Sequence, residues 1–272
     1  MVLRRQSRWA VALPLVVALA GLSGCGSSGT AAPAASAAAS APSSPAGGGA
    51  TTVTVFAAAS LTGTFTELGK SFETAHPGTT VKFNFGSSAT LAQQITAGAP
   101  ADVFAAASPA TMKTVTDAGL ASAPTTFVRN KLEIAVPADN PAKVDDLKDL
   151  TDAKVKVALC AEQVPCGAAA VKALDAAGLK VTPVTLEQDV KATLTKVELG
   201  EVDAALVYKT DVIASGGKVK GIAFPEADKA INDYPVATLS KAPAPDLAKQ
   251  FVDLVLSAEG KGVLTKAGFE AP

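Results

Sequence analysis

The stretch Val53-Thr-Val-Phe-Ala-Ala-Ala-Ser60-Leu61 has the pattern of a buried strand that runs directly into a helix. Its first half is rich in strand-forming residues and carries no charge. From Leu61 the spacing changes, because Leu61, Phe65 and Leu68 recur on one face of a helix. We therefore expect a strand followed by a helix, with Ser60 at the N-cap between them.

Such a junction is a natural place for a small anion. The first amides of a helix have no intrahelical partner, and they carry the positive end of the helix dipole. An anion can bind there without a lysine or arginine. Similar junctions recur at Ser88 and at Val164-Pro-Cys-Gly167, another helix is expected to begin at Asp189–Val190, and Tyr208 ends a predicted strand.

Strands and helices alternate along the rest of the chain. Further strands are expected at 81–85, 102–106, 132–136, 155–159, 203–208, 219–224 and 234–239. This alternation predicts an α/β fold with mostly parallel sheets flanked by helices. In such sheets, ligands bind beyond the carboxyl ends of the strands.

The first fifty residues have the composition of an export signal and a tether. Three arginines precede an apolar run at 9–22, which predicts a signal peptide over residues 1–24. The sequence Leu22-Ser-Gly-Cys25 resembles a bacterial lipobox, in which Cys25 would be the lipidated first residue of the mature chain. The alternative is an ordinary cleavage site with an incidental cysteine. Residues 26–50 contain only Ala, Ser, Gly, Pro and Thr, so 25–50 is expected to be a flexible tether behind the lipid.

Charge and cysteine content exclude some classes of function. The formal net charge is −1 and aromatic residues make up 5% of the chain, which argues against nucleic-acid binding. Cys160 and Cys166 are expected to form a disulfide in an exported protein, with two reduced thiols as the alternative. The single histidine, His76, is far from both cysteines in sequence, which argues against a zinc site.

The segment Phe56-Ala-Ala-Ala-Ser-Leu61 resembles the opening of the molybdate-binding proteins of ABC importers. The similarity extends over nearly all of the chain after residue 51. It implies a type II periplasmic-binding-protein fold with two α/β lobes and a cleft between them. Lobe I would comprise 51–132 and 236–272, and lobe II 133–235. No catalytic residue and no cofactor are implied.

The resemblance also implies a ligand set. In this family the oxyanion is held by two serines, two backbone amides and a tyrosine. The matching positions here are the side chains of Ser60, Ser88 and Tyr208 and the amides of Cys166 and Val190. The motif Val-Pro-Cys-Gly departs from the commoner Val-Pro-Ala-Gly, but a cysteine still presents its backbone N–H. A disulfide from Cys160 would stiffen the loop that carries this amide.

A set made only of hydrogen-bond donors suits molybdate, a dianion with no proton to donate at neutral pH. Hydrogen phosphate would need an acceptor in the pocket, whereas sulfate can be distinguished only by size and tungstate is not expected to be rejected. The resemblance thus implies a monomeric, lipid-anchored, extracytoplasmic receptor that delivers molybdate to a membrane permease.

Two other functions remain open from the residues alone. One is a receptor for another oxyanion such as sulfate, since cavity size is not visible in the sequence. The other is a secreted hydrolase with Ser60 or Cys166 as nucleophile, which would need His76 as its base. Each candidate also has an ordinary structural interpretation: a serine before a helix is often only a cap, and Tyr208 could be half-buried core.

Overall fold

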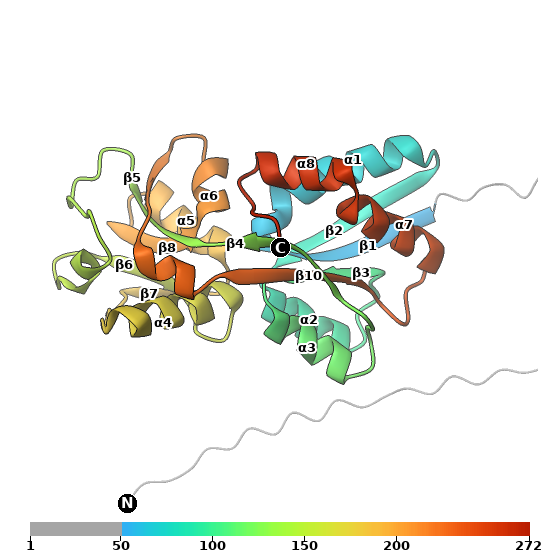
Figure 1. The fold of residues 1–272 in the computed structure, drawn as a ribbon, viewed down its shortest axis with the longest axis horizontal. Helices are drawn as coiled ribbons and strands as arrows, with labels where there is room; N and C mark the ends of the chain where they lie inside the picture. The colour runs from blue at the N-terminus through green and yellow to red at the C-terminus, as the bar shows by residue number, and fades with distance from the viewer. Residues whose placement is uncertain (1–50) are drawn as a thin grey trace, which may run out of the picture. The chain divides into compact units, whose positions relative to one another are not determined.

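The computed structural model describes residues 51–272, which form two five-stranded sheets with helices packed on them (Figure 1). The signal peptide, the lipidated Cys25 and the tether predicted for residues 1–50 lie outside the described residues. Within 51–272, no helix is both long enough and apolar enough to cross a membrane.

The first sheet has the strand order β2-β1-β3-β10-β4. Its strands are β1 (Thr51–Ala58), β2 (Thr79–Gly86), β3 (Val103–Ala105), β4 (Thr125–Asn130) and β10 (Asn232–Thr238). Strand β1 runs parallel to β2 and β3, whereas β10 runs antiparallel to β3 and β4.

The second sheet has the order β7-β6-β8-β5-β9. Its strands are β5 (Leu132–Pro137), β6 (Val157–Cys160), β7 (Thr185–Glu187), β8 (Ala204–Tyr208) and β9 (Val219–Ile222). Strand β6 is parallel to β7 and β8, and β5 is antiparallel to β8 and β9. The predicted two-lobe α/β fold is confirmed. Each sheet is mixed, because one strand that follows a crossing, β10 in the first sheet and β5 in the second, runs against the other four.

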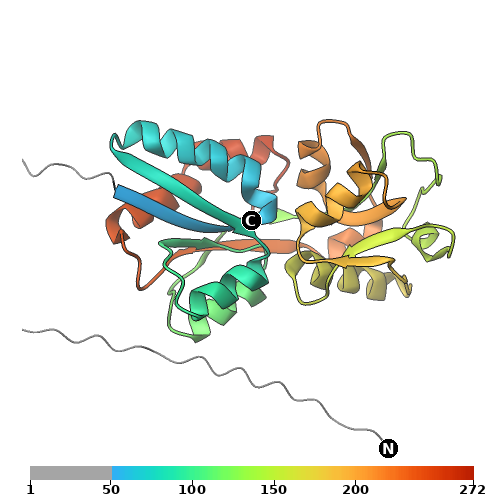
Figure 2. The ribbon, with the colours of Figure 1, turned by 180° about the vertical axis from the view of Figure 1, so that it is seen from behind.

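Helices cover both faces of the first sheet, as the view from behind also shows (Figure 2). Its helices are α1 (Thr62–Ala75), α2 (Ser88–Thr96), α3 (Pro109–Asp117), α7 (Pro245–Leu256) and α8 (Ala258–Lys266). The alternation of β1 separates two cores: Val53 and Val55 pack in a cluster with residues of α1, α7 and α8, while Phe56 packs with residues of α2 and α3. The C-terminal helices therefore belong to the first lobe.

The second sheet packs with α4 (Pro165–Ala177), α5 (Val190–Glu198) and the short α6 (Lys209–Ala214). Three short 3₁₀ turns, at Ala59–Leu61, Lys148–Thr151 and Pro225–Lys229, complete the described elements. The chain passes between the sheets twice, once between β4 and β5 and once before β10. Because all of β10 belongs to the first sheet, the return begins at Asn232, ahead of the expected boundary at residue 236.

Candidate functional site

A small cavity lies where elements of the two sheets meet. Its volume is about 20 Å³, slightly more than the 10–15 Å³ or so that admits one water molecule. All five predicted ligand residues line it: Ser60, Ser88, Cys166, Val190 and Tyr208. Among residues 51–272, Asp189 has the only charged side chain in the lining. The cavity therefore has the size for one small ion and no cationic side chain to neutralise it.

The carboxyl ends of parallel strands converge on this cavity. Ser60 follows β1, Ser88 follows β2, the segment containing Cys166 follows β6, Val190 follows β7, and Tyr208 ends β8. This arrangement is the one expected for ligand sites in open α/β sheets. It explains how residues distant in the sequence reach a single point.

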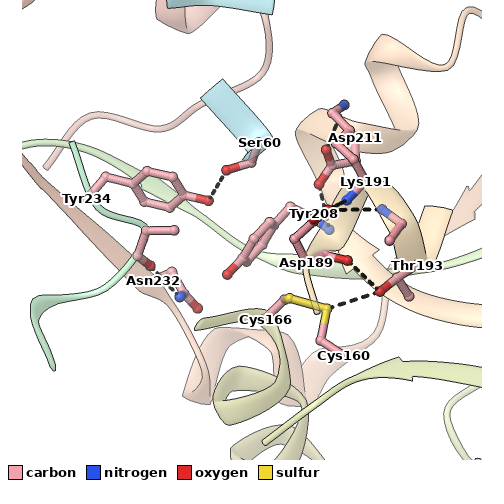
Figure 3. The surroundings of a disulfide bond; sticks show 12 residues. Ser60, Cys160, Cys166, Asp189, Lys191, Thr193, Tyr208, Asp211, Asn232 and Tyr234 are labelled. Carbon is pink, nitrogen blue, oxygen red and sulfur yellow. Dashed lines mark hydrogen bonds and ion pairs between the residues drawn. A yellow bond between two sulfur atoms is a disulfide. The ribbon is translucent and has the colours of Figure 1, made fainter. Parts of the chain in front are cut away.

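Ser60 does not occupy the predicted N-cap. It lies inside the 3₁₀ turn Ala59–Leu61, and Leu61 is the N-cap of α1. Its hydroxyl oxygen is instead 2.9 Å from the hydroxyl of Tyr234 (Figure 3). The 3₁₀ turn between β1 and α1 therefore moves Ser60 out of the capping position. The Ser60 side chain is instead hydrogen-bonded to Tyr234 in β10, a strand of the same sheet.

Two adjacent serines begin α2, and they have different surroundings. Ser88 is buried, and its Oγ accepts a hydrogen bond of 2.9 Å from the amide of Ala107. Ser87 occupies the N-cap but makes no side-chain capping bond, and its buried Oγ has no hydrogen-bond partner among the described residues. Ser87 also lines the cavity, although only Ser88 was predicted from the sequence.

The start of α4 brings a backbone amide to the cavity. Pro165 and Cys166 lie in the first turn, where amides have no intrahelical partner. Gly167 is required here, because a Cβ at this position would overlap the carbonyl oxygen of Ala161. Cys166 forms a disulfide with Cys160 at the end of β6, with the two Cα atoms 5.8 Å apart. The close approach and the disulfide both hold the helix start against the strand end.

The start of α5 supplies the second predicted amide, that of Val190. Asp189 is the N-cap, and its Oδ1 accepts hydrogen bonds of 2.8 and 3.0 Å from the amides of Lys191 and Ala192. The carboxylate is thus hydrogen-bonded to its own helix, whereas the amide of Val190 at the first position has no intrahelical acceptor. The one acidic residue of the cavity has a capping role in the structure.

Tyr208 is 1% exposed, and its hydroxyl has no hydrogen-bond partner among the described residues (Figure 3). Burial, followed by the proximity of Tyr234 and Asp211, raises the pKa of the Tyr208 hydroxyl well above its usual value of 10.0. The phenol therefore keeps its proton and remains a hydrogen-bond donor at physiological pH.

An ion pair between the buried Asp211 and the partly exposed Lys191 lies next to Tyr208. Asp211 accepts a hydrogen bond of 3.3 Å from the Tyr208 amide, and its other oxygen lies 2.9 Å from the Lys191 ammonium group. Asp211 is fully buried, and desolvation raises the pKa of its carboxyl despite the opposing effect of Lys191. The pair connects the first turn of α5 to the first turn of α6. It therefore holds the two segments that carry the Val190 amide and the Tyr208 hydroxyl next to each other.

Three polar residues around the cavity were not anticipated from the sequence. Tyr234 contacts Ser60, Asn130 contacts Tyr234, and Asn232 donates a hydrogen bond of 2.7 Å to the carbonyl of Ala107. All three lie in β4 or β10, the strands next to the crossings. No local sequence signal marks them, because their partners are more than a hundred residues away.

The chemistry of the hydrolase alternative is not assembled here. His76 bonds the carbonyl of Phe72 through Nδ1 and the side chain of Gln250 through Nε2, away from the cavity. The Cys166 sulfur is in the disulfide, and the Ser60 hydroxyl is hydrogen-bonded to Tyr234. Within residues 51–272 no group of three or more His, Cys, Asp or Glu side chains could hold a metal ion.

Comparison with known proteins identifies relatives over nearly the whole described region. A model of the family described as "Bacterial extracellular solute-binding protein" matches residues 53–270. The molybdate-binding protein ModA of Mycobacterium tuberculosis is 43% identical over 225 residues, covering 82% of this chain and 86% of that protein. The putative ABC transporter substrate-binding lipoprotein YvgL of Bacillus subtilis is 35% identical over 227 residues, covering 81% and 86% respectively.

Among solved structures, the periplasmic molybdate-binding protein of Azotobacter vinelandii shares the fold. It matches with a TM-score of 0.71 at 21% identity, covering 81% of this chain and 99% of that chain.

Proposed function

Because this chain belongs to the bacterial extracellular solute-binding protein family, we propose that it captures molybdate in the cavity between its two lobes and delivers it to an ABC importer. The identity to a molybdate-binding protein of Mycobacterium tuberculosis over most of both chains supports this ligand. The resemblance of the chain to substrate-binding proteins supports a membrane permease as the partner.

One observation carries the proposal. The hydroxyls of Ser87 and Tyr208 are buried, unpartnered within the described residues, and located on the wall of the same cavity. A buried polar group without a partner costs about 1–3 kcal/mol. A tetrahedral oxyanion would accept hydrogen bonds from both hydroxyls and remove that cost.

The remaining contacts follow from the geometry. Ser60 and Ser88 would donate from the first lobe, and the amides of Cys166 and Val190 from the helix starts of the second lobe. The two helix dipoles would offset the charge of a dianion without a salt bridge. Because the donors come from both lobes, closure of the lobes around the ion would complete its coordination and exclude water.

Selectivity would rest on two properties of the cavity. The absence of a free acceptor in the donor set disfavours oxyanions that carry a proton. The small volume limits the size of the ion, and tungstate, which has nearly the size of molybdate, would bind as well. A sulfate receptor is the alternative within the same class, since sulfate has the same charge and the same acceptor pattern.

The location proposed for the protein is the extracytoplasmic face of the membrane, where Cys25 would carry the lipid. The description of the Bacillus subtilis relative as a lipoprotein supports this location. A monomer on a flexible tether would be able to reach the permease.

Isothermal titration calorimetry of the purified protein tests the ligand. Molybdate and tungstate should bind at sub-micromolar concentration, and sulfate and phosphate at least about a hundredfold more weakly, which corresponds to roughly 2.7 kcal/mol. Matched titrations of the Ser87→Ala/Tyr208→Phe variant should show a large loss of molybdate affinity. Heat release with sulfate and none with molybdate would overturn the proposal in favour of the sulfate receptor.

A further inference from the structure

Ser60 and Ser88, two of the three first-lobe serines that line the cavity, each form a side-chain hydrogen bond within the protein. For Ser88 the donor is the backbone amide of Ala107, at 2.9 Å. An amide N–H can only donate, so it occupies a lone pair of the Ser88 hydroxyl and leaves the hydroxyl proton free. Because Ser88 lines the cavity, that proton is available to an ion bound there.

The corresponding bond of Ser60 is between two hydroxyls, and either oxygen could donate. Ser60 Oγ and Tyr234 Oη are 2.9 Å apart. Asn130 decides the direction of this bond. Its Oδ1 accepts a hydrogen bond of 3.0 Å from the amide of Lys131, which fixes which end of the side-chain amide is oxygen.

The Nδ2 group of Asn130 therefore points the other way. It donates to Thr210 Oγ1 at 2.8 Å and to Tyr234 Oη at 3.4 Å. An amide nitrogen does not accept a hydrogen bond, so the Tyr234 proton cannot be directed to Asn130. Ser60 Oγ, at 2.9 Å, is the acceptor within hydrogen-bonding distance that remains for the Tyr234 proton, and we assign the bond as Tyr234 donating to Ser60.

We propose that Tyr234, oriented by Asn130, is a positioning residue that directs the Ser60 hydroxyl proton toward the cavity and thereby disfavours protonated oxyanions at this contact. The proposal rests on the proposed function of the cavity as an oxyanion site. Tyr234 would not touch the ion. By donating to Ser60 it would occupy one of the two acceptor positions of that hydroxyl, which makes acceptance of a proton from the anion less favourable.

The surroundings of Tyr234 suit this role. The side chain is fully buried, and its ring packs edge-on against Phe127, Phe269 and Tyr208 at centroid distances between 5.5 and 6.4 Å. The phenol is thus held in place by aromatic packing that does not depend on its hydroxyl. Burial, the largest effect on the pKa of the Tyr234 hydroxyl, raises it, so the proton that the hydroxyl donates to Ser60 is retained.

The test is the variant Tyr234→Phe, which keeps the ring and removes only the hydroxyl. Molybdate and hydrogen arsenate are matched probes, because in mildly alkaline buffer both are tetrahedral dianions and only the second carries a proton. Without Tyr234, the Ser60 hydroxyl is free to rotate and accept that proton. We expect the ratio of the hydrogen arsenate Kd to the molybdate Kd, measured by competition calorimetry, to fall at least about tenfold.

A double-mutant cycle separates positioning from a purely structural effect. In the Ser60→Ala background, Tyr234→Phe should leave the ratio of the two Kd values unchanged, because the hydroxyl that Tyr234 orients is missing. Tyr208→Phe makes the same chemical change at a residue placed to contact the ion. It should weaken both anions without improving the relative binding of hydrogen arsenate.

The outcomes distinguish this inference from the function on which it rests. If the unmodified protein fails to bind molybdate, the proposed function fails. If that protein binds molybdate but Tyr234→Phe weakens both anions by the same factor, or changes neither, the positioning role of Tyr234 is wrong. An unfolding temperature of Tyr234→Phe measured without anion checks that the variant is folded.

Discussion

The hydroxyls of Ser87 and Tyr208 are the least satisfied polar groups of the cavity, and this has opposite consequences for stability and for binding. Each is buried without a hydrogen-bond partner within residues 51–272. Such a group destabilises the empty protein and gains a partner only when an acceptor enters. Removing it should therefore weaken binding without weakening the fold.

For Tyr208→Phe we expect molybdate affinity to fall by about 1–3 kcal/mol, the effect of leaving a buried acceptor without its donor. The unfolding temperature without anion should stay the same or rise, because the Tyr208 hydroxyl has no partner to lose. Calorimetric titration and thermal unfolding measure the two effects separately. A clear drop in stability without anion would mean that the hydroxyl has a structural partner.

The neighbouring serines offer a second contrast. Ser87→Ala should behave like Tyr208→Phe, with weaker binding and an unchanged fold. Ser88→Ala should also lower the stability of the empty protein by about 1 kcal/mol, because the buried amide of Ala107 loses its acceptor. Urea unfolding of the two variants without anion tests the difference. Equal stability of the two would contradict the distinct surroundings that we describe.

The sequence predicted some features of Ser87 and Ser88 but not others. The run Gly-Ser-Ser at 86–88 predicted a polar helix start, and the family resemblance indicated Ser88. Nothing local indicated that Ser87, in the capping position, would leave its own helix uncapped. Tyr234 could not be found at all, since it lies 174 residues from Ser60 and no spacing rule connects them.

At the scale of elements, the alternation of apolar segments predicted most strands and helices but not the direction of the strands. An apolar run such as that of β5 predicts a buried strand, but it does not indicate whether that strand pairs parallel or antiparallel with its neighbours. The short strand β7 and the polar strand β4 were missed, because three residues or a mixed sequence such as Thr-Thr-Phe-Val-Arg-Asn gives little periodic signal. The start of α1 was placed one residue early, at Leu61 instead of Thr62, because the 3₁₀ turn Ala59–Leu61 precedes the helix.

The disulfide at the start of α4 gives a prediction for this element. Replacing both Cys160 and Cys166 with alanine should lower the free energy of unfolding by about 2 kcal/mol, the value for a short closed loop. Molybdate affinity should change by less than about 0.5 kcal/mol, because the proposed contact is a backbone amide and a cysteine side chain is not a donor in it. Denaturant unfolding and calorimetry measure both.

Thiol alkylation of the native protein provides the control. Two alkylated thiols in the region of Cys160 and Cys166 without prior reduction would show that the bond is absent in solution. A loss of affinity as large as that of Tyr208→Phe would mean that the bond, rather than the close contact at Gly167, holds the amide in place.

The ion pair between α5 and α6 predicts a pH dependence of stability. The pKa of Asp211 is raised above its ordinary value of 3.8, chiefly by burial, so the folded state favours the neutral carboxyl. Its stabilising contribution is fully present below that value and is lost as pH rises through the raised pKa. The Asp211→Asn variant, which does not titrate, should therefore gain stability relative to the unmodified protein as pH increases from about 4 toward neutrality.

A companion variant sharpens this test. Lys191 lies 2.9 Å from Asp211 and opposes the rise in its pKa. Lys191→Met should therefore make the loss of stability with rising pH steeper than in the unmodified protein. Unfolding curves of the three proteins across that pH range are the measurement. If the free energy of unfolding depended on pH in the same way in all three proteins, burial would not raise the pKa of Asp211, and the prediction would be wrong.

For the whole molecule, the position of the cavity matters more than any single contact. Its lining comes from strand ends of both sheets, and only β4–β5 and the segment before β10 connect those sheets. An ion bound there would contact both lobes and neither could unfold without releasing it. Ligand binding should therefore stabilise the two lobes together.

We expect scanning calorimetry with molybdate at a hundredfold excess over its Kd to show one transition, stabilised by about 2.7 kcal/mol relative to the empty protein. Tyr208→Phe, measured at the same molybdate concentration, should show a smaller increase in proportion to its weaker binding. Two separate transitions, with only one shifted by molybdate, would place the ion in a single lobe. That result would contradict a site built jointly from Ser60 and Ser88 on one side and Cys166, Val190 and Tyr208 on the other.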